Sequence, residues 1–434
     1  MGKNNKIRQS IYPPIWLGKK VQWVNKMFFI LLLFVCSLFS LGNTMNEGPG
    51  IAPNSLREAI KSASPYDTIL LNSGVYNEHG LIIDKPLTLI GQEGTIIDAE
   101  GQGEIITVTS DSVHIINLTL ANVGISHTKD QAAIHLDKVK YFSIHNVVLE
   151  AAFFGILVEK SSHGTISSNQ ISGIGKSEFY SGNGIHLWHS DFVEVKDNKI
   201  SNMRDGIYFE FVTKSKVEGN HSENNIRYGL HFMFSDNDEY NNNTFINNGA
   251  GVAVMFSKYI EMTNNTFQDN WGASSFGLLL KEIYDANIQG NLFLRNTVAI
   301  HVDGSSRIKY EDNVFKQNGW GFRVTGGCYE NNVVSNDFIS NSFDISYNGR
   351  LNDNKFIGNY WSNYSGYDLN RDGVGDVPFR PVSLFSYIVN KTPESVILLR
   401  SLFVDLLNYS EKVSPVFTPD NLIDEKPNMK PLND

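Results

Sequence analysis

A short motif that recurs at intervals of 22 to 29 residues constrains the fold more than any other feature of this sequence. Each copy opens with Gly or Ala and continues with alternating apolar residues. The opening residues are Ala133, Gly155, Gly184, Gly206, Gly229, Gly251, Gly277, Ala299 and Gly321. From Gly155 to Ala299, an Asn lies 14 residues after each opening residue, although the period itself varies. A constant offset within a variable period indicates a solenoid whose insertions leave from one loop of the repeat.

The composition of the repeats predicts a β-solenoid. Between residues 100 and 360 there is no sustained helical stripe of apolar residues, and the consensus of leucine-rich repeats is absent. The apolar runs are short, rich in Val, Ile and Phe, and separated by Gly, Asn, Asp and Ser, as in strands joined by turns. We therefore expect an all-β fold, a right-handed parallel β-helix over residues 105–380, with turns stacked about 4.8 Å apart. The repeated Asn residues are expected to form a side-chain ladder at one corner.

Strand alternation assigns the residues of each copy to two faces. The first and third residues after the opening Gly or Ala are apolar, as in Ile185 and Leu187, and are expected in the core. The second and fourth residues are then expected on the outer face. In chain order these outward residues are Leu157, Glu159, His186, Trp188, Tyr208, Glu210, His231, Met233, Ala253, Met255, Leu279, Lys281, His301, Asp303, Arg323 and Thr325. An exposed surface that carries Trp, Tyr, Met and His on neighbouring turns is typical of a binding surface.

Four of the outward residues have the chemistry of copper ligands. His231 and Met233 lie two residues apart, about 6.6 Å along one expected strand, and Met255 follows Met233 one turn later, at about 4.8 Å. His186 lies two turns before His231, and the small Ala253 leaves room beside them. Thioether and imidazole ligands favour Cu(I) over harder cations, so these residues predict a transient Cu(I) site. The alternative is that they pack beneath a long loop, because Met commonly fills gaps in packing.

The N-terminal segment 1–42 has the features of a secretory signal peptide. An apolar run at residues 27–41 follows three lysines and precedes Gly42, near which we expect cleavage. The run is shorter than the roughly 20 residues that span a membrane, although an uncleaved N-terminal anchor is the alternative. After cleavage Cys328 is the only cysteine, so the exported protein is expected to have no internal disulfide.

The distribution of charge argues against a nucleic-acid partner. The formal net charge is -10, and no cluster of Lys and Arg residues interrupts the repeats. Nucleic-acid interfaces need a basic patch or stripe, which this sequence does not provide.

Residues 50–104 are expected to close the N-terminal end of the solenoid. Ser55 and Glu58 have the spacing of a capping box ahead of a short helix that begins near Pro53 and ends near Ile60. Short strands of the first turns follow. A cap at this end would cover unpaired strand edges and apolar core.

The sequence after Pro381 no longer shows the repeat. Within 381–414, Thr392 and Pro393 are typical of a helix start, and an apolar face continues to about residue 409. This helix is expected either to fold back on the solenoid or to dock on a membrane partner. Residues 415–434 are expected to form a flexible tail.

The segment between the repeats and the C-terminal helix carries a specific motif. Residues 358–379, GNYWSNYSGYDLNRDGVGDVPF, resemble a signature of NosD-type proteins, the periplasmic β-helix maturation factors of nitrous oxide reductase. The repeats at 227–235, 251–257 and 277–281 also resemble repeats of that family, and the resemblance extends over roughly residues 50–417. The sequence departs from the signature at three positions. Asn363 replaces an acid, and Asn370 and Arg371 replace Asp and Gly.

The resemblance implies a function that the residues alone do not show. It implies a non-enzymatic periplasmic protein that works with an ABC transporter, whose cytoplasmic subunit hydrolyses ATP. It further implies that the protein takes copper from a membrane-anchored copper chaperone and helps to load it into apo-nitrous oxide reductase. The direction of copper transfer and its coupling to ATP hydrolysis are left open.

An acidic stretch within the signature has half of a calcium-loop pattern. Asp368, Asn370, Asp372 and Asp376 occupy oxygen-ligand positions, but Phe379 stands where a bidentate Glu is required. The sequence leaves open a weak Ca²⁺ site and an Asx-rich turn that its own side chains stabilise. The nearby aromatic residues are expected to cap the end of the β-helix, and they are Tyr360, Trp361, Tyr364 and Tyr367.

Two other classes of function compete with copper handling. Many β-helices act on polysaccharides, so a carbohydrate lyase, epimerase, hydrolase or binding module is the main alternative. The residues that could serve such chemistry are Glu210, Lys281, Asp303 and Arg323. They are spread over different turns without an acid pair at one level. An adhesive solenoid would explain the repeats but not the Met and His residues on the outer face.

Overall fold

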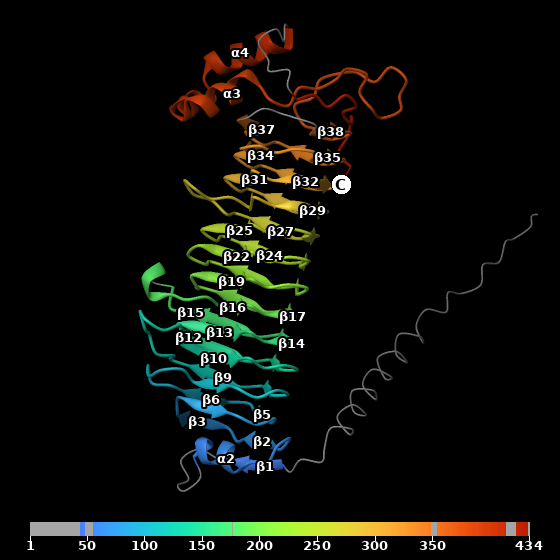
Figure 1. The fold of residues 1–434 in the computed structure, drawn as a ribbon. Helices are drawn as coiled ribbons and strands as arrows, with labels where there is room; N and C mark the ends of the chain where they lie inside the picture. Colours follow the sequence, from blue (N-terminus) through green and yellow to red (C-terminus); the bar gives the residue numbers. More distant parts are fainter. Residues whose placement is uncertain (1–43, 48–54, 176, 349–353, 414–421, 433–434) are drawn as a thin grey trace, which may run out of the picture. The chain divides into compact units, whose positions relative to one another are not determined.

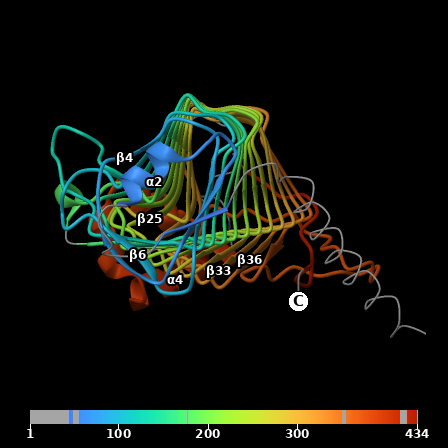
Figure 2. The same ribbon diagram turned by 90° about the horizontal axis from the view of Figure 1, so that it is seen from below.

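The computed structural model describes residues 44–47, 55–175, 177–348, 354–413 and 422–432. The expected signal peptide lies outside these ranges. Within them the chain forms three parallel sheets, and each complete turn of the chain contributes a strand to each sheet (Figure 1). Figure 2 shows the successive turns superimposed when the stack is seen from one end. The predicted parallel β-helix is therefore confirmed.

The first sheet, sheet A, has 14 strands, each bonded to the strands of the turns before and after it. Its strands are β1 (Thr44–Glu47), β2 (Thr68–Leu71), β5 (Thr88–Gly91), β8 (His114–Ile116), β11 (Ser143–His145), β14 (Ser162–Ser167), β17 (Asp191–Lys196), β20 (Lys216–Glu218), β23 (Glu239–Asn241), β26 (Glu261–Thr263), β29 (Tyr284–Gln289), β32 (Ser306–Glu311), β35 (Asn332–Val334) and β38 (Lys355–Ile357).

The second sheet, sheet B, has 13 strands. They are β3 (Gly74–Asn77), β6 (Thr95–Asp98), β9 (Thr119–Ala121), β12 (Val148–Ala152), β15 (Gln170–Gly173), β18 (Lys199–Ser201), β21 (His221–Glu223), β24 (Thr244–Ile246), β27 (Thr266–Gln268), β30 (Leu292–Leu294), β33 (Val314–Lys316), β36 (Asp337–Ile339) and β39 (Tyr360–Trp361).

The third sheet, sheet C, has 12 strands and contains the recurring motif. They are β4 (Leu81–Ile83), β7 (Ile106–Val108), β10 (Ala132–Asp137), β13 (Phe154–Glu159), β16 (Ile185–Trp188), β19 (Asp205–Glu210), β22 (Tyr228–Met233), β25 (Ala250–Met255), β28 (Leu278–Lys281), β31 (Val298–Asp303), β34 (Trp320–Thr325) and β37 (Phe343–Asn348).

The register of sheet C follows the alignment of the motif. Ile185 pairs with Ile207, Ile207 with Leu230, and Leu230 with Val252, so the first apolar residue of each copy stacks on that of the next. These residues are fully buried, as are the third residues of the same copies. The opening glycine is required by close approach of the next turn, since a Cβ on Gly184 would lie 2.5 Å from the carbonyl oxygen of Gly206.

Buried asparagines connect the turns in two ladders. In the ladder that the sequence predicted, the side-chain amide and the backbone N–H of Asn169 both donate to Oδ1 of Asn198, at 2.9 and 3.0 Å. The same pattern continues through Asn220, Asn243, Asn265, Asn291, Asn313, Asn336 and Asn359. A second ladder contains Asn225, Asn248, Asn270, Asn296, Asn318 and Asn341.

Each ladder ends on an aspartate. Because every amide in a ladder donates onward, the last asparagine needs an acceptor outside the ladder. Asn359 donates to Oδ2 of Asp424 at 3.0 Å, and Asn341 donates to Oδ1 of Asp344 at 3.2 Å. Both carboxylates are buried.

A short helix covers the N-terminal end as expected. Helix α2 (Leu56–Ser62) begins after Ser55, whose hydroxyl accepts from the backbone N–H of Glu58. Its Leu56 and Ile60 side chains are buried in the main core. The predicted capping helix is therefore present, with its apolar face on the first turns.

The expected flexible tail is wrong for the part that the structure describes. Residues 422–432 pack on the C-terminal end of the solenoid, where Leu422 and Asp424 are buried. Asp424 accepts from Trp361 Nε1 at 3.0 Å, and Asn428 N donates to the carbonyl of Asn359. The sequence of this segment is polar and has no repeat, so its role as a cap depends on contacts made across more than 60 residues.

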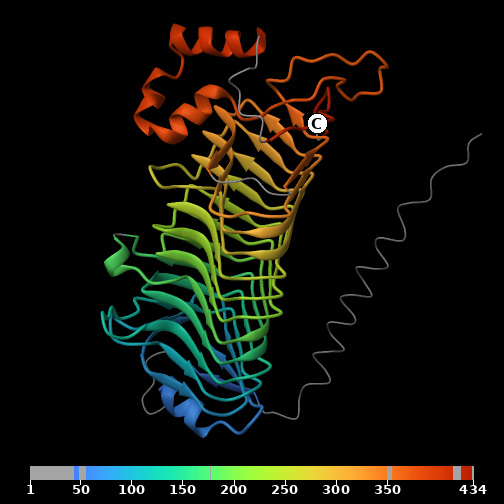
Figure 3. The same ribbon diagram turned by 45° about the horizontal axis from the view of Figure 1, so that its top comes forward.

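The C-terminal helical segment is divided differently from the prediction. The structure has α3 (Leu384–Lys391), a 3-10 helix η2 (Pro393–Leu398) and α4 (Leu402–Val413), rather than one helix from Pro393 (Figure 3). Thr392 precedes η2 without a side-chain capping bond, and Arg400 has a positive φ of 74° that separates η2 from α4.

None of the helices in the described ranges has the length and hydrophobicity that crossing a membrane requires.

The aspartate that ends the ladder from Asn169 to Asn359 predicts a stability effect. We expect Asp424→Ala to lower the free energy of unfolding by about 3 kcal/mol or more, because several buried N–H groups lose a charged acceptor. Urea unfolding followed by circular dichroism measures this change. Glu425→Ala is the control, since Glu425 is the exposed neighbour. Equal effects of the two variants would contradict the role of Asp424 as the terminal acceptor.

Candidate functional site

The four predicted copper ligands lie on the outer face of sheet C, on strands β16, β22 and β25. His186 pairs with Tyr208, and Tyr208 pairs with His231, so the two histidines are two turns apart in one row. Met233 pairs directly with Met255 in the neighbouring row. The register that the sequence predicted for these residues is therefore observed.

The two histidines were expected to be exposed, but the structure buries them. His186 is 8% exposed and His231 is 6% exposed. The ring of Tyr208 stacks between them, with centroid distances of 4.7 Å to each. Phe154 stacks on the far side of His186 at 6.2 Å, and Tyr228 covers His231 at 4.8 Å. Strand alternation places a side chain outside the sheet, but it does not show which aromatic neighbours then cover it.

The ring nitrogens of the two buried histidines have no hydrogen bond within the part of the chain that the structure describes. All four, those of His186 and of His231, are buried there without a partner. An unpaired buried atom is also present on three polar residues of the insertions, Ser181, Asn183 and Ser275. Buried polar atoms are nearly always paired in folded proteins, so the unpaired nitrogens of these two histidines mark them as candidate ligands.

Burial sets the protonation of His186. Burial, with a smaller contribution from the charge of Arg204, lowers the pKa of His186 to about 4. His186 is therefore neutral near pH 7, as a metal ligand must be. The buried carboxylate of Asp205 lies 3.8 Å from Nδ1 of His231 and 3.6 Å from Nε of Arg227. The sequence analysis missed Asp205, since it precedes the opening glycine and so falls outside the aligned positions.

The two methionines occupy a more open part of the same face. Met233 and Met255 are half-buried, and the hydroxyl of Tyr208 lies 3.8 Å from the Met233 sulfur. Glu210 pairs with Met233 on one side, and Lys281 pairs with Met255 on the other. The thioether pair therefore lies between an acid and a base, beside the closed histidine row.

An aromatic row that the sequence analysis missed borders the methionines. Phe211, Phe234 and Phe256 each follow the fourth residue of a motif, and their rings stack from turn to turn at 5.1 Å. His189 stacks on Phe211 at 4.6 Å. Phe211 and Phe234 are exposed, with positive φ angles, so they form an apolar ridge beside Met233 and Met255. The signal was an aromatic residue at the fifth position of three successive copies.

A second group of titratable residues lies on the same face nearer the N-terminus. His135 lies 3.2 Å from Glu104 through Nδ1 and 3.0 Å from Glu159 through Nε2. Burial by itself lowers the pKa of His135, but the hydrogen bonds and charges of the two glutamates outweigh it and raise the pKa. This arrangement favours the protonated imidazole between the two carboxylates.

The candidate carbohydrate-processing residues remain on separate turns. Glu210, Lys281 and Arg323 belong to β19, β28 and β34, while Lys281 pairs with Asp303 of β31. The described part of the chain has no group of three His, Cys, Asp or Glu side chains arranged to hold a metal ion.

The acidic stretch at 368–376 forms a turn held by its own carboxylates. Asp368 accepts the backbone N–H groups of Arg371, Asp372 and Gly373, and Asp376 accepts that of Leu369. These bonds are those of the Asx-rich turn that the sequence left open beside calcium binding.

Trp361 caps the aromatic core, stacking on Phe338 at 4.2 Å, whereas Tyr367 is exposed.

The comparisons with known proteins identify relatives of the whole solenoid. Residues 169–366 match the family described as "Periplasmic copper-binding protein (NosD)". A "Probable ABC transporter binding protein NosD" of Stutzerimonas stutzeri is 27% identical over 369 residues, covering 80% of this chain and 84% of its own. A protein of Pseudomonas aeruginosa with the same description is 28% identical over 426 residues, covering 88% and 95%. The resemblance to NosD-type proteins is therefore confirmed.

Solved structures share the fold at low sequence identity. The crystal structure of the periplasmic alginate epimerase AlgG superposes with a TM-score of 0.53 and 14% identity, covering 71% of this chain and 81% of that chain. At this identity the likeness shows the β-helix fold alone.

The His135 cluster predicts a pH dependence. Because its pKa is raised in the folded protein, His135 stabilises the fold fully below its unfolded pKa of about 6.5, and this stabilisation is lost as the pH rises through the folded pKa. We expect the free energy of unfolding to fall across that window in the native protein but not in His135→Gln. Urea unfolding in the presence of a chelator, at pH values from about 6 to 9, measures the difference. An unchanged slope in the variant would contradict the assignment.

Proposed function

We propose that this chain is a non-catalytic periplasmic copper-handling protein that works with an ABC transporter and delivers Cu(I) to apo-nitrous oxide reductase. The relatives of the chain support a periplasmic role in copper binding with an ABC transporter, since they are described as a periplasmic copper-binding family and as ABC transporter binding proteins. The reductase as acceptor and a membrane-anchored chaperone as donor extend the proposal beyond those descriptions.

One observation carries the copper proposal. Two buried histidines with four unpaired ring nitrogens lie beside two directly paired methionines. A neutral imidazole and thioether sulfurs are soft or borderline ligands, which bind Cu(I) in preference to the harder cations. We therefore propose His231, Met233 and Met255 as Cu(I) ligands, with His186 as a further nitrogen donor.

The arrangement suits a metal that is passed on. Met233 and Met255 are half-buried and reachable from solvent, whereas His186 and His231 lie beneath aromatic rings. Copper would thus meet sulfur ligands first and imidazole second. Lys281 and Glu210 flank the sulfurs and leave the outer side of the ion open for a ligand from a partner protein.

Cu(I) competition assays test the ligands. We expect Met233→Ala/Met255→Ala to weaken Cu(I) binding at least about tenfold, the effect of losing roughly 1.4 kcal/mol, without a change in the unfolding midpoint. The assay is competition with a colorimetric Cu(I) chelator under anaerobic conditions. Met429→Ala is the matched control, because Met429 lies near the C-terminal end and far from β22 in the sequence. Unchanged affinity in the double variant would remove these residues from the proposal.

The exposed apolar side of the C-terminal helices is the proposed contact with the transporter's membrane subunit. Val404 packs with Phe343 of β37 and Phe385 of α3, so part of the segment belongs to the solenoid end. The opposite side leaves large apolar side chains in water, with Ile397 86% and Leu402 74% exposed. Exposed apolar surface of this extent is typical of an interface.

Surface variants separate docking from folding. We expect Leu402→Ser/Phe403→Ser/Leu406→Ser to retain the native melting temperature while losing co-purification with the transporter subunits, because these side chains are exposed. Leu369→Ser, an exposed leucine of the acidic turn, is the control that should retain association. Loss of the fold in the triple variant, or full association, would contradict a docking role.

A further inference from the structure

The ring of Tyr208 lies between the two buried histidines of sheet C. Its centroid is 4.7 Å from that of His186 and 4.7 Å from that of His231, at interplanar angles of 35° and 19°. The strand register explains this order, because Tyr208 pairs with His186 of the turn before and with His231 of the turn after. The three rings therefore form one stack over three turns, with Tyr208 in the middle.

The stack keeps the two imidazoles too far apart to bind the same metal ion. Strands two turns apart in one sheet are separated by about 9–10 Å. An imidazole nitrogen binds a metal at roughly 2 Å, so two nitrogens that share an ion are at most about 4 Å apart. His186 and His231 cannot approach each other to that distance while an aromatic ring lies between them. His186 is therefore excluded from an ion held by His231 as long as Tyr208 keeps this position.

Contacts at both ends of its side chain hold Tyr208 in the stack. The ring is sandwiched between the two imidazoles, and the hydroxyl lies 3.8 Å from the sulfur of Met233. The carboxylate of Glu210, on the same strand, is close enough to interact with the hydroxyl. Tyr208 is nevertheless half-buried on the outer face of sheet C, so it is not part of the solenoid core. Its substitution is therefore expected to leave the fold intact.

The groups around Tyr208 would suit a divalent metal if the two imidazoles could meet. The buried carboxylate of Asp205 lies 3.8 Å from Nδ1 of His231, and its charge also acts on His186. Two imidazoles with a carboxylate are a ligand set that Zn²⁺ and related divalent ions bind well. Within the described ranges, no three such side chains are arranged to hold a metal ion. The Tyr208 ring is the group that keeps two members of this set apart.

We propose that Tyr208 determines the metal specificity of this site by keeping His186 out of the coordination of the ion. The inference rests on the proposed copper function, and it leaves the ion with the imidazole of His231 and the thioethers of Met233 and Met255. One imidazole with two thioethers is a soft set that favours Cu(I), whereas two imidazoles with a carboxylate favour divalent ions. His186 becomes a ligand only when the Tyr208 ring is displaced.

A purely structural role of Tyr208 makes different predictions. If the ring only filled space, Tyr208→Ala would change the melting temperature but not the number of nitrogen ligands on a bound ion. Tyr208→Phe keeps the ring and removes only the hydroxyl, so it should behave as the native protein in every metal assay. If Tyr208→Ala lowers the melting temperature, Tyr208→Thr replaces it, because a β-branched residue suits a strand and is still too small to separate the imidazoles.

X-ray absorption spectroscopy of the Cu(I)-loaded protein, with chelator competition, tests the proposal. We expect sulfur ligands with a single nitrogen in the native protein and in Tyr208→Phe, and a second nitrogen in Tyr208→Ala. The second nitrogen should raise the Cu(I) affinity of Tyr208→Ala at least about tenfold. Tyr208→Ala/His186→Ala should lose both the second nitrogen and the gain in affinity, since His186 supplies them.

Calorimetry with Zn²⁺ and the copper-free protein tests the same separation without the methionines. We expect Tyr208→Ala to bind Zn²⁺ at least about tenfold more tightly than the native protein or Tyr208→Phe. The gain should disappear when either His186 or His231 is also changed to Ala, because it requires both imidazoles on one ion.

The two assays separate failure of this inference from failure of the proposed function. A second nitrogen already present in the native protein, or a Tyr208→Ala variant without a His186-dependent gain for either metal, would overturn the role of Tyr208 and leave the copper function standing. A Zn²⁺ gain in Tyr208→Ala, together with a native protein that binds no Cu(I), would support the separation of the imidazoles by Tyr208 and contradict the copper function.

Discussion

Hydrogen bonds between stacked asparagine side chains are the interaction on which the rest of this structure depends. Each buried Oδ1 accepts from the backbone and the side chain of the preceding turn, so one residue type satisfies the polar groups of a whole corner. A single such bond contributes only about 1 kcal/mol net, but leaving a buried amide unpaired costs about 1–3 kcal/mol. The ladder therefore fixes which residue of each turn lies above which residue of the last.

That register creates the outer face. Once the asparagines are aligned, the motifs of sheet C are aligned as well, and side chains from distant parts of the sequence become neighbours. Met233 meets Met255, and His186 and His231 are brought to either side of Tyr208. The insertions before Gly184 and Gly277 add loops to this face. Phe276, from the second of these loops, stacks on Tyr228, which covers His231. The same regularity that stabilises the solenoid thus assembles its candidate site.

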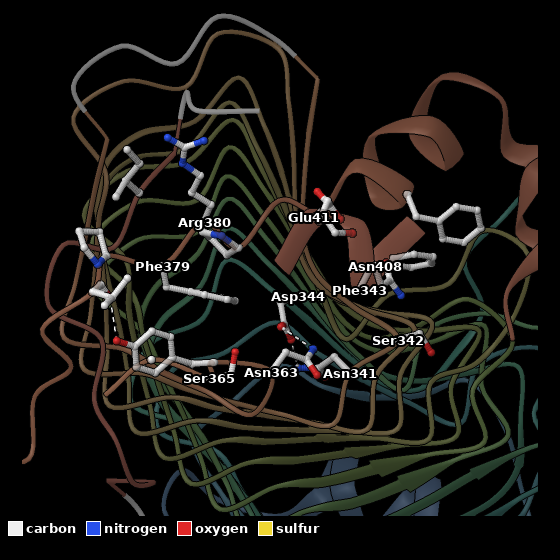
Figure 4. A pocket seen from close by; sticks show the side chains of 18 of the residues that line it. Asn341, Ser342, Phe343, Asp344, Asn363, Ser365, Phe379, Arg380, Asn408 and Glu411 are labelled. Atoms are coloured by element: carbon white, nitrogen blue, oxygen red, sulfur yellow. Dashed lines mark hydrogen bonds between the residues drawn. The ribbon is translucent and has the colours of Figure 1, made fainter. Parts of the chain in front are cut away.

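The directionality of the ladders also explains the C-terminal end. A chain of donors that all point one way needs an acceptor at its end, and carboxylates fill that role in both ladders. Asp424 comes from the returning C-terminal segment and is fully engaged by N–H groups. Asp344 comes from the last strand of sheet C, and among the described residues it accepts from the side-chain amides of Asn341 and Asn363 (Figure 4). The end of the solenoid is where the regular bonding stops, and these carboxylates supply the acceptors that the next turn would have supplied.

The sequence by itself determined the solenoid, its register and the direction in which each motif residue points. It could do so because period two and a constant 14-residue offset depend only on local geometry and chain length. The sequence did not predict the burial of His186 and His231, the aspartates that end the ladders, or the packing of residues 422–432. These features arise from contacts between side chains that no repeat relates. Only the tertiary structure decided them, because packing depends on which loops and ends meet in space rather than on the pattern of one strand.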